Sequence, residues 1–167
     1  MAKKKTKKNY YVAYGSNMNL EQMRWRCPLS VPIGKAYLKG YKLVFNIHAD
    51  IIPTGDDKDV LPVALWDINP SEWGRLDMYE GYPKYYTREK VNVITEDGEL
   101  VEATVYVMTK ERKGIAPPAA TYFYGIVQGC EDFGITPNHI MKAVRESVKN
   151  PTEYNQYNPC KASKAVV

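Results

Sequence analysis

The chain has few of the residues that bind metals or form disulfides, with 3 cysteines and 2 histidines among 167 residues. Cys27, Cys130 and Cys160 are odd in number and far apart, without the paired spacing of a zinc site or a disulfide framework. His48 and His139 do not form a pair with metal-ligand spacing, which argues against zinc catalysis built on His and Cys. We therefore expect free thiols in a reducing compartment, and structural or surface roles for both histidines.

Several sequence signals are also missing. No apolar run approaches the roughly 20 residues that a membrane-spanning helix needs. The lysine-rich start leads into tyrosines and Gly-Ser-Asn, and not into the apolar region of a signal peptide. A phosphate loop ending in GKS or GKT and a Gly-x-Ser-x-Gly nucleophile elbow are both absent, and a Ser16 nucleophile would need one of the two histidines as its base. These absences predict a soluble, cytoplasmic protein without a membrane partner.

Positive charge is concentrated at the start of the chain. Five of the 23 Lys and Arg residues lie among residues 1–8, which leaves 18 to set against 19 Asp and Glu. We expect residues 1–9 to be a disordered basic terminus, residues 10–149 a single domain, and residues 150–167 a peripheral tail. We expect no nucleic-acid partner. The alternative, a basic arm, predicts steeply salt-dependent binding that is lost when residues 1–9 are deleted.

Strand signals dominate the domain. Runs rich in Tyr, Val and Thr predict strands at residues 10–14, 35–48 and 60–68, and two more between residues 85 and 108. Residues 49–59 are turn-rich, and Pro62 predicts that the strand over 60–68 is an edge or bulged strand. Asp97-Gly98 predicts a hairpin between the last two strands.

Helix signals predict four helices, over residues 20–26, 69–81, 118–134 and 136–150. Asn19 and Asn69 are the expected N-caps of the first two, with Gln22 and Glu72 three residues later as their reciprocal partners. Strands outnumber helices, and hairpin signals exceed those for repeated βαβ crossovers. The predicted fold class is α+β, with a mixed, strongly curled, barrel-like β-sheet and flanking helices.

Glu80 contradicts local preference at the end of the second predicted helix. Helical spacing places it on one face with Trp73 and Leu76, so the side that these residues bury also carries a carboxylate. The helix macrodipole disfavours negative charge in the last turn, and apolar neighbours desolvate it. Both effects raise the pKa of a carboxyl group toward the range of general acid–base catalysis. The alternative is a surface glutamate at a frayed helix end.

Gly15-Ser16-Asn17 connects the first predicted strand to the first helix. Such a turn leaves backbone N–H groups unpaired, and glycine lets another molecule approach the main chain. It can hold a carboxylate or a developing oxyanion, although an ordinary polar connection is the alternative. The excess of 14 Tyr over 3 Phe also suits a polar pocket, because tyrosine adds a hydroxyl to its ring.

Four fragments together resemble the gamma-glutamylcyclotransferase-like family: YGSNM at 14–18, LDMYEGYPKYYTREKVNV at 76–93, VYVMT at 105–109 and PPAATYFYGIVQGCEDFGI at 117–135. The resemblance extends from about Tyr11 to Ser147 and depends on the order and spacing of the fragments. It implies a compact barrel-like mixed sheet with flanking helices, a small-molecule gamma-glutamyl substrate, and an active site that needs neither a metal nor a cofactor.

The resemblance also implies site residues. The family's catalytic glutamate falls on Glu80. Asn17 stands where the glutathione-directed branch usually has Leu, so the chain looks more similar to the branch that acts on other gamma-glutamyl compounds. The substrate-binding loop of the family falls on Tyr14, Gly15, Ser16, Asn17 and Met18.

Two further substrate-binding tyrosines of the family fall on Tyr86 and Tyr122. Tyr85 is the alternative to Tyr86, because this chain looks one residue shorter than the family pattern there.

In the implied reaction, the α-amine of a gamma-glutamyl amide attacks its own γ-carbonyl, which releases 5-oxoproline and an amine or amino acid. Glu80 would act as base and then as acid. One alternative is an enzyme of the same scaffold that cyclises a gamma-glutamylamine or a gamma-glutamyl tag on a metabolite. Another is a non-catalytic member that binds a small ligand or partner. The sequence leaves the leaving group and the oligomeric state open.

Overall fold

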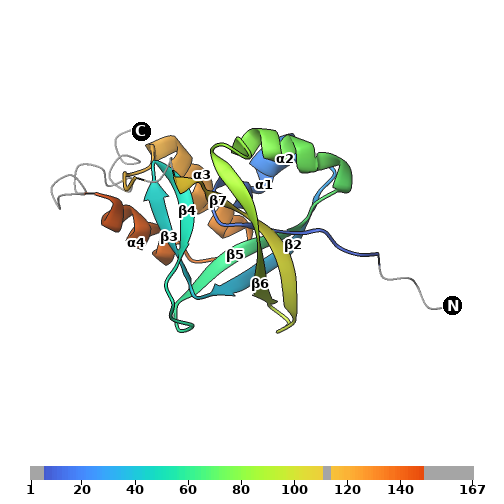
Figure 1. Ribbon diagram of the computed structural model, residues 1–167, viewed down its shortest axis with the longest axis horizontal. Coiled ribbons are helices and arrows are strands. Elements are labelled where there is room, and N and C mark those ends of the chain that lie inside the picture. The colour runs from blue at the N-terminus through green and yellow to red at the C-terminus, as the bar shows by residue number, and fades with distance from the viewer. Residues whose placement is uncertain (1–5, 111–113, 149–167) are drawn as a thin grey trace.

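The computed structural model describes residues 6–110 and 114–148. Five strands form a closed barrel in the order β1-β5-β2-β6-β7. Antiparallel pairs make most of the barrel, and the parallel pairing of β1 with β7 closes it (Figure 1). The predicted α+β fold with a barrel-like mixed sheet is therefore confirmed. The strands are β1 (Tyr10–Ala13), β2 (Val31–Lys39), β5 (Val60–Asp67), β6 (Tyr86–Thr95) and β7 (Leu100–Met108).

Residues 1–5 of the predicted basic terminus, and the predicted tail at 150–167 with Cys160, lie outside the described residues. Within the described part of the terminus, Asn9 is already attached to the barrel. Its backbone N–H donates to Asp67 Oδ1 at 2.8 Å, and its carbonyl accepts from Ile68 N at 2.9 Å.

A second, two-stranded sheet stands apart from the barrel and consists of β3 (Tyr41–Asn46) and β4 (His48–Pro53). The prediction of one strand over 35–48 is therefore wrong. The predicted turn is confirmed over residues 54–59 but is wrong over residues 49–53, which belong to β4. The chain breaks at Gly40, with a φ of 76°, and reverses at Ile47, with a φ of 68°. Three successive buried residues, Ala49 to Ile51, replace the alternation that marks a half-buried strand, so β4 had no period-two signal.

The strand with Pro62, β5, lies between β1 and β2, so the prediction of an edge strand is wrong. The bulge is on β2, between Pro32 and Gly34. Proline is nevertheless tolerated, because β1 pairs with β5 only along residues 64–67, and Pro62 faces Tyr37 of β2 alone.

The hairpin predicted at Asp97-Gly98 is confirmed. Residues 96–99 connect β6 to β7, and Gly98 has a φ of 82° in the left-handed region. The two strands pair continuously from Tyr86 opposite Met108 to Ile94 opposite Leu100. This long ladder carries Tyr86 from the hairpin to the opposite end of the barrel.

The predicted N-caps are confirmed, but their reciprocal partners are wrong. Asn19 Oδ1 accepts from the Gln22 N–H, and Asn69 Oδ1 accepts from the Ser71 N–H, both at 3.0 Å. The Gln22 side chain instead accepts from Arg26. The helical elements are η1 (Ser16–Met18), α1 (Leu20–Arg26), η2 (Pro70–Glu72), α2 (Trp73–Glu80), α3 (Ala120–Asp132) and α4 (Asn138–Ser147).

Glu72 joins two segments and does not close a capping box. Its side chain is buried and accepts from Leu29 N at 3.0 Å and from Ser30 Oγ at 2.6 Å. Ser30 Oγ in turn accepts from the backbone N–H of Asn69 at 3.0 Å. The start of η2 is thus attached to the segment that follows α1.

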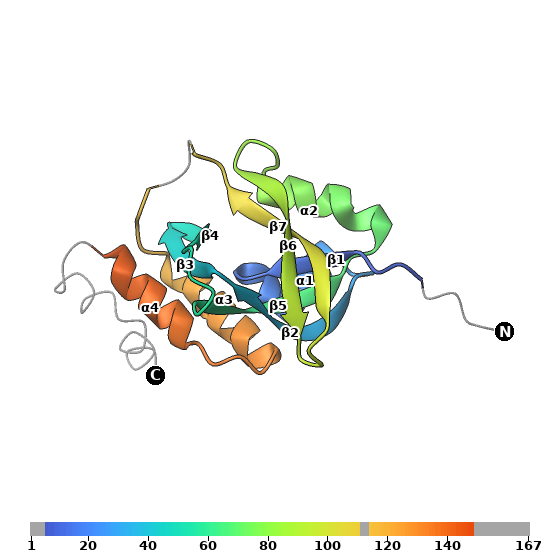
Figure 2. The same ribbon diagram turned by 60° about the horizontal axis from the view of Figure 1, so that its bottom comes forward.

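Helix α3 approaches η1 closely. Figures 1 and 2 show α3 on the same side of the barrel as α4. One face of α3 packs into the core, where Ile126 and Cys130 are fully buried. Gly129 allows the approach, since a Cβ at this position would lie 2.7 Å from both Asn19 N and Met18 C. Helix α4 covers β3 on the same side of the molecule.

Gly129→Ala should lower the free energy of unfolding by about 1–3 kcal/mol, because the added methyl group meets backbone atoms that can move only with the whole η1 segment. Gly74→Ala is the matched control, since this helical glycine has no atom near its Cβ position. The control should raise the free energy of unfolding by about 0.5–1 kcal/mol. Urea unfolding of both variants checks the prediction, and a Gly129→Ala variant as stable as the wild type would contradict it.

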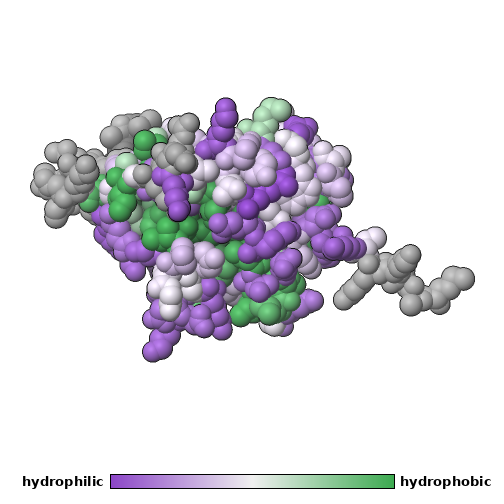
Figure 3. All heavy atoms as spheres, viewed as in Figure 1, coloured by the Kyte–Doolittle hydropathy of each residue, from purple (hydrophilic) through white to green (hydrophobic). Residues whose placement is uncertain are grey.

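The face of the molecule in Figure 3 is mainly hydrophilic, with smaller hydrophobic areas between the charged side chains. Among the helices that the structure describes, none combines the length and the apolar character needed to span a membrane.

Candidate active site

A pocket of about 290 Å³ opens where the end of β1, η1, the end of α2 and the starts of β4 and β6 meet. Seven of its 15 lining residues are tyrosines, which accounts for part of the tyrosine excess in the sequence. The lining residues are Tyr11, Tyr14, Gly15, Ser16, Asn17, His48, Ala49, Met78, Tyr79, Glu80, Gly81, Tyr85, Tyr86, Tyr106 and Tyr122.

Glu80 lies at the end of α2 and lines the pocket. Asn17 Nδ2 donates a hydrogen bond to Glu80 Oε1 at 2.9 Å. Burial raises the pKa of Glu80 to about 7, against the opposing effects of the Arg26 charge and the Asn17 hydrogen bond. A carboxyl group with this pKa can both accept and donate a proton near neutral pH.

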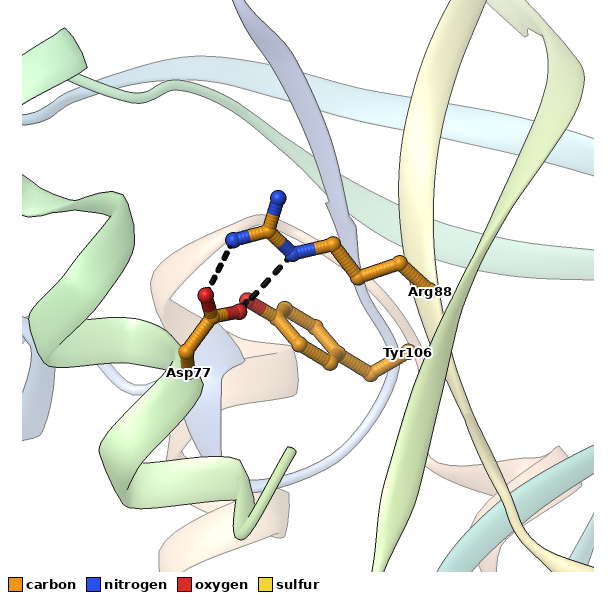
Figure 4. A network of polar contacts seen from close by, with 3 residues as sticks. All are labelled: Asp77, Arg88 and Tyr106. Carbon is orange, nitrogen blue, oxygen red and sulfur yellow. Dashed lines mark hydrogen bonds and ion pairs between the residues drawn. The ribbon is translucent and has the colours of Figure 1, made fainter. Parts of the chain in front are cut away.

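The helix that carries Glu80 is held by a polar network one turn earlier (Figure 4). Asp77 accepts from two of the three guanidinium nitrogens of Arg88, Nε and Nη2, and from the Tyr106 hydroxyl at 2.6 Å. Arg88 belongs to β6 and Tyr106 to β7, so the network attaches α2 to the barrel. The helix then ends at Gly81, whose φ of 63° suits glycine.

The segment predicted as a substrate cradle forms η1. Ser16 and Asn17 are buried, and the backbone N–H groups of Met18 and Asn19 donate back to Gly15 and Ser16. The N–H groups of Ser16 and Asn17 lie before the first donors of this turn. Among the described residues, no acceptor forms a hydrogen bond with either of them. They can therefore donate to a bound molecule.

Gly15 is crowded by the pocket wall. A Cβ at this position would lie 3.2 Å from Ala49 Cβ and 3.3 Å from the Tyr122 hydroxyl oxygen. The absence of a side chain at Gly15 thus lets β4 and α3 pack close to this segment. It also leaves room for a molecule that enters the pocket. Met18, in contrast, is fully buried in the core and does not line the pocket. The prediction that Met18 binds the substrate is therefore wrong, because η1 turns the Met18 side chain toward α3.

Both Tyr85 and Tyr86 line the pocket, so the alternative between them disappears. The Tyr86 hydroxyl donates to the Ala49 carbonyl at 2.7 Å, whereas the Tyr122 hydroxyl accepts from the Ala49 N–H at 3.0 Å. Tyr122 therefore keeps its own proton for another acceptor. Burial raises the pKa of Tyr86 and of Tyr122 well above the usual value, so both are neutral hydroxyls at pH 7.

Sequence reasoning missed several pocket residues. His48 was expected to be structural or on the surface, but it lines the pocket, and its Nδ1 lies 2.8 Å from the Tyr85 hydroxyl oxygen. Burial lowers its pKa. Tyr11, Tyr79 and Tyr106 were also missed. The excess of tyrosine and the position of Tyr79 next to Glu80 were the available signals. No residue spacing in the sequence predicts that β4 or β7 lies beside the segment at residues 15–17.

In residues 6–110 and 114–148, no group of three or more His, Cys, Asp and Glu side chains could hold a metal ion. The two described cysteines are buried free thiols and do not line the pocket. Burial raises the pKa of Cys27 to about 11 and that of Cys130 to about 12, so neither is a thiolate at neutral pH.

Comparisons with known proteins identify the family of this chain. The family model described as gamma-glutamyl cyclotransferase, AIG2-like, matches residues 11–124. Gamma-glutamylcyclotransferase of Homo sapiens is 29% identical over 136 residues, covering 75% of this chain and 71% of the human protein. That of Mus musculus is 28% identical over 157 residues, covering 86% and 80%. A solved structure named gamma-glutamyl cyclotransferase has a TM-score of 0.72 at 27% identity, covering 82% of this chain and 86% of its own. The chain therefore belongs to the gamma-glutamyl cyclotransferase, AIG2-like family, as its four fragments predicted.

Proposed function

We propose that this protein catalyses the cyclisation of a gamma-glutamyl amide, releasing 5-oxoproline and an amine or amino acid. The observation that carries the proposal is the Glu80 carboxyl group, which lines the pocket, accepts a hydrogen bond from Asn17 and has a pKa raised to about 7. Relatives named gamma-glutamylcyclotransferase support the reaction class.

The proton transfers assign two successive roles to Glu80. The substrate's α-amine is protonated at neutral pH and becomes a nucleophile only when it loses a proton to the carboxylate. The amine nitrogen, which still carries two hydrogens, then bonds to the γ-carbon, the amide C–N bond breaks, and the leaving nitrogen takes the proton back from Glu80. The ring nitrogen gives up its second proton through the same carboxylate to the departing amine, so the products are the 5-oxoproline lactam and an ammonium group. Because the substrate supplies its own nucleophile, the reaction needs no serine or cysteine.

The pocket would fold the flexible substrate so that its amine reaches the γ-carbonyl. Well-oriented intramolecular reactions gain up to roughly 7–11 kcal/mol from such placement. The donors available for the anionic groups of the substrate are the N–H groups of Ser16 and Asn17 and the Tyr122 hydroxyl. The hydroxyl protons of Tyr14 and Tyr86 are already donated to backbone carbonyls, so these two rings serve as walls.

A panel of gamma-glutamyl amino acids, gamma-glutamylamines and glutathione tests the proposal. We expect at least one class to give 5-oxoproline and the free amine or amino acid in equal amounts, above a blank without protein. The same substrate acetylated on its α-amine should give neither product, because it lacks the nucleophile. Saturable binding of these compounds without turnover would instead favour the non-catalytic alternative.

A further inference from the structure

We infer that Arg26, which does not line the pocket, is a positioning residue that fixes the Asn17 amide so that its amino group faces the Glu80 carboxylate. The catalytic consequence rests on the proposed function, whereas the geometry can be tested without turnover.

Arg26 is the last residue of α1 and reaches back to η1. Its Nη1 donates to Asn17 Oδ1 at 2.6 Å and to Ser16 Oγ at 3.1 Å, and its Nη2 donates to Gln22 Oε1 at 2.6 Å. The planar guanidinium group suits several acceptors in fixed directions, which a lysine ammonium group does not reproduce.

These contacts determine which way the Asn17 amide points. An amide carries an acceptor oxygen and a donor nitrogen on opposite sides. With the oxygen bound to Arg26, Asn17 Nδ2 donates to Glu80 Oε1 and to the Tyr11 hydroxyl, both at 2.9 Å. The flipped amide would place its oxygen against the carboxylate oxygen and its amino group against the guanidinium group, so both contacts would be repulsive.

Arg26 also contacts the helix that carries Glu80. Its guanidinium carbon lies 3.7 Å from the ring centroid of Tyr79, the residue before Glu80. The Tyr79 hydroxyl oxygen is in turn 3.3 Å from Ser16 Oγ. The same side chain therefore joins α1, η1 and the end of α2 around the pocket.

The charge of Arg26 acts in the same direction as the hydrogen bond. Burial raises the pKa of Glu80, while Arg26 and Asn17 lower it. Four neutral phenols also couple to Glu80, on β1, just after β1, on β6 and on α3, and burial raises their pKa values; they are Tyr11, Tyr14, Tyr86 and Tyr122. His48 of β4 lines the same pocket, and burial lowers its pKa. Without Arg26, a larger fraction of Glu80 would be protonated near pH 7 and unable to accept a proton.

The first test compares the pH dependence of kcat/KM for Arg26→Gln, Arg26→Lys and the wild type on one substrate. Arg26→Gln should lose about tenfold at pH 6 and less at pH 9, which corresponds to a rising limb displaced by about one pH unit. Arg26→Lys keeps the positive charge but loses the several N–H donors of the planar guanidinium group. The rising limb of its pH profile should therefore stay at the wild-type position, while kcat falls at every pH. Arg24→Gln is the matched control, because Arg24 is exposed in the same last turn of α1.

The second test needs no turnover. In protein labelled with ¹³C at the glutamate side-chain carboxyl, the Glu80 resonance is the one that disappears in Glu80→Gln. It should titrate near pH 7 in the wild type and at higher pH in Arg26→Gln. An unchanged midpoint would overturn the inference, as would wild-type kcat in Arg26→Lys. Absence of 5-oxoproline together with a displaced midpoint would reject the proposed function and leave the role of Arg26 intact.

Discussion

Glu80→Gln should reduce the rate of 5-oxoproline release by about 10²- to 10⁴-fold, the usual contribution of a general acid–base group. The glutamine side chain has the same shape and keeps an oxygen for the Asn17 amino group, which donates to Glu80 Oε1 at 2.9 Å in the wild type. It cannot take a proton from the α-ammonium group of the substrate. The expected loss is therefore in kcat, with a small change in KM.

The measurement is steady-state release of 5-oxoproline with the best substrate of the panel. Glu89→Gln is a suitable control, since Glu89 is an exposed glutamate on β6 that does not line the pocket. Circular dichroism should show that both variants fold. A folded Glu80→Gln variant that retains the wild-type rate would remove this carboxyl group from the mechanism.

Glu80 should also make the protein less stable as the pH rises. Burial raises the pKa of Glu80 from 4.5 to about 7, so between these pH values the unfolded chain releases a proton that the folded chain retains. Stability falls with pH wherever the folded state binds more protons. Relative to Glu80→Gln, the free energy of unfolding of the wild type should fall by about 3 kcal/mol from pH 4.5 to pH 7 and then level off.

Urea unfolding of both proteins at several pH values measures this difference, and subtracting the Glu80→Gln curve removes the contributions of all other titrating groups. A difference that stays constant from pH 4 to pH 8 would contradict the raised pKa of Glu80. A difference that grows in favour of the wild type would show instead that the folded protein stabilises the ionised carboxylate.

Much of the local structure could be predicted from the sequence, because its causes lie within a few residues. Asn19 and Asn69 cap helices through bonds to N–H groups two or three residues away, and Asp97-Gly98 supplies the backbone freedom of a hairpin. The face of α2 that buries Leu76 also predicted that Glu80 would be partly withdrawn from solvent. The predictions failed at β4, whose three consecutive buried residues lack alternation.

The sequence by itself determined most of the elements, the fold class, the family and the apolar helix face that carries the Glu80 carboxyl group, since each depends on local spacing or on an ordered set of motifs. Only the tertiary structure decided that Asn17 contacts Glu80, 63 positions away in the sequence, and that Arg26 binds the Asn17 amide oxygen. It also decided that His48 lines the pocket and that Met18 lies in the core. The physical reason is that α2 and the second sheet pack on the barrel, which brings β1, α2 and β4 together. Contacts between such distant segments depend on how whole elements pack, which no short sequence pattern encodes.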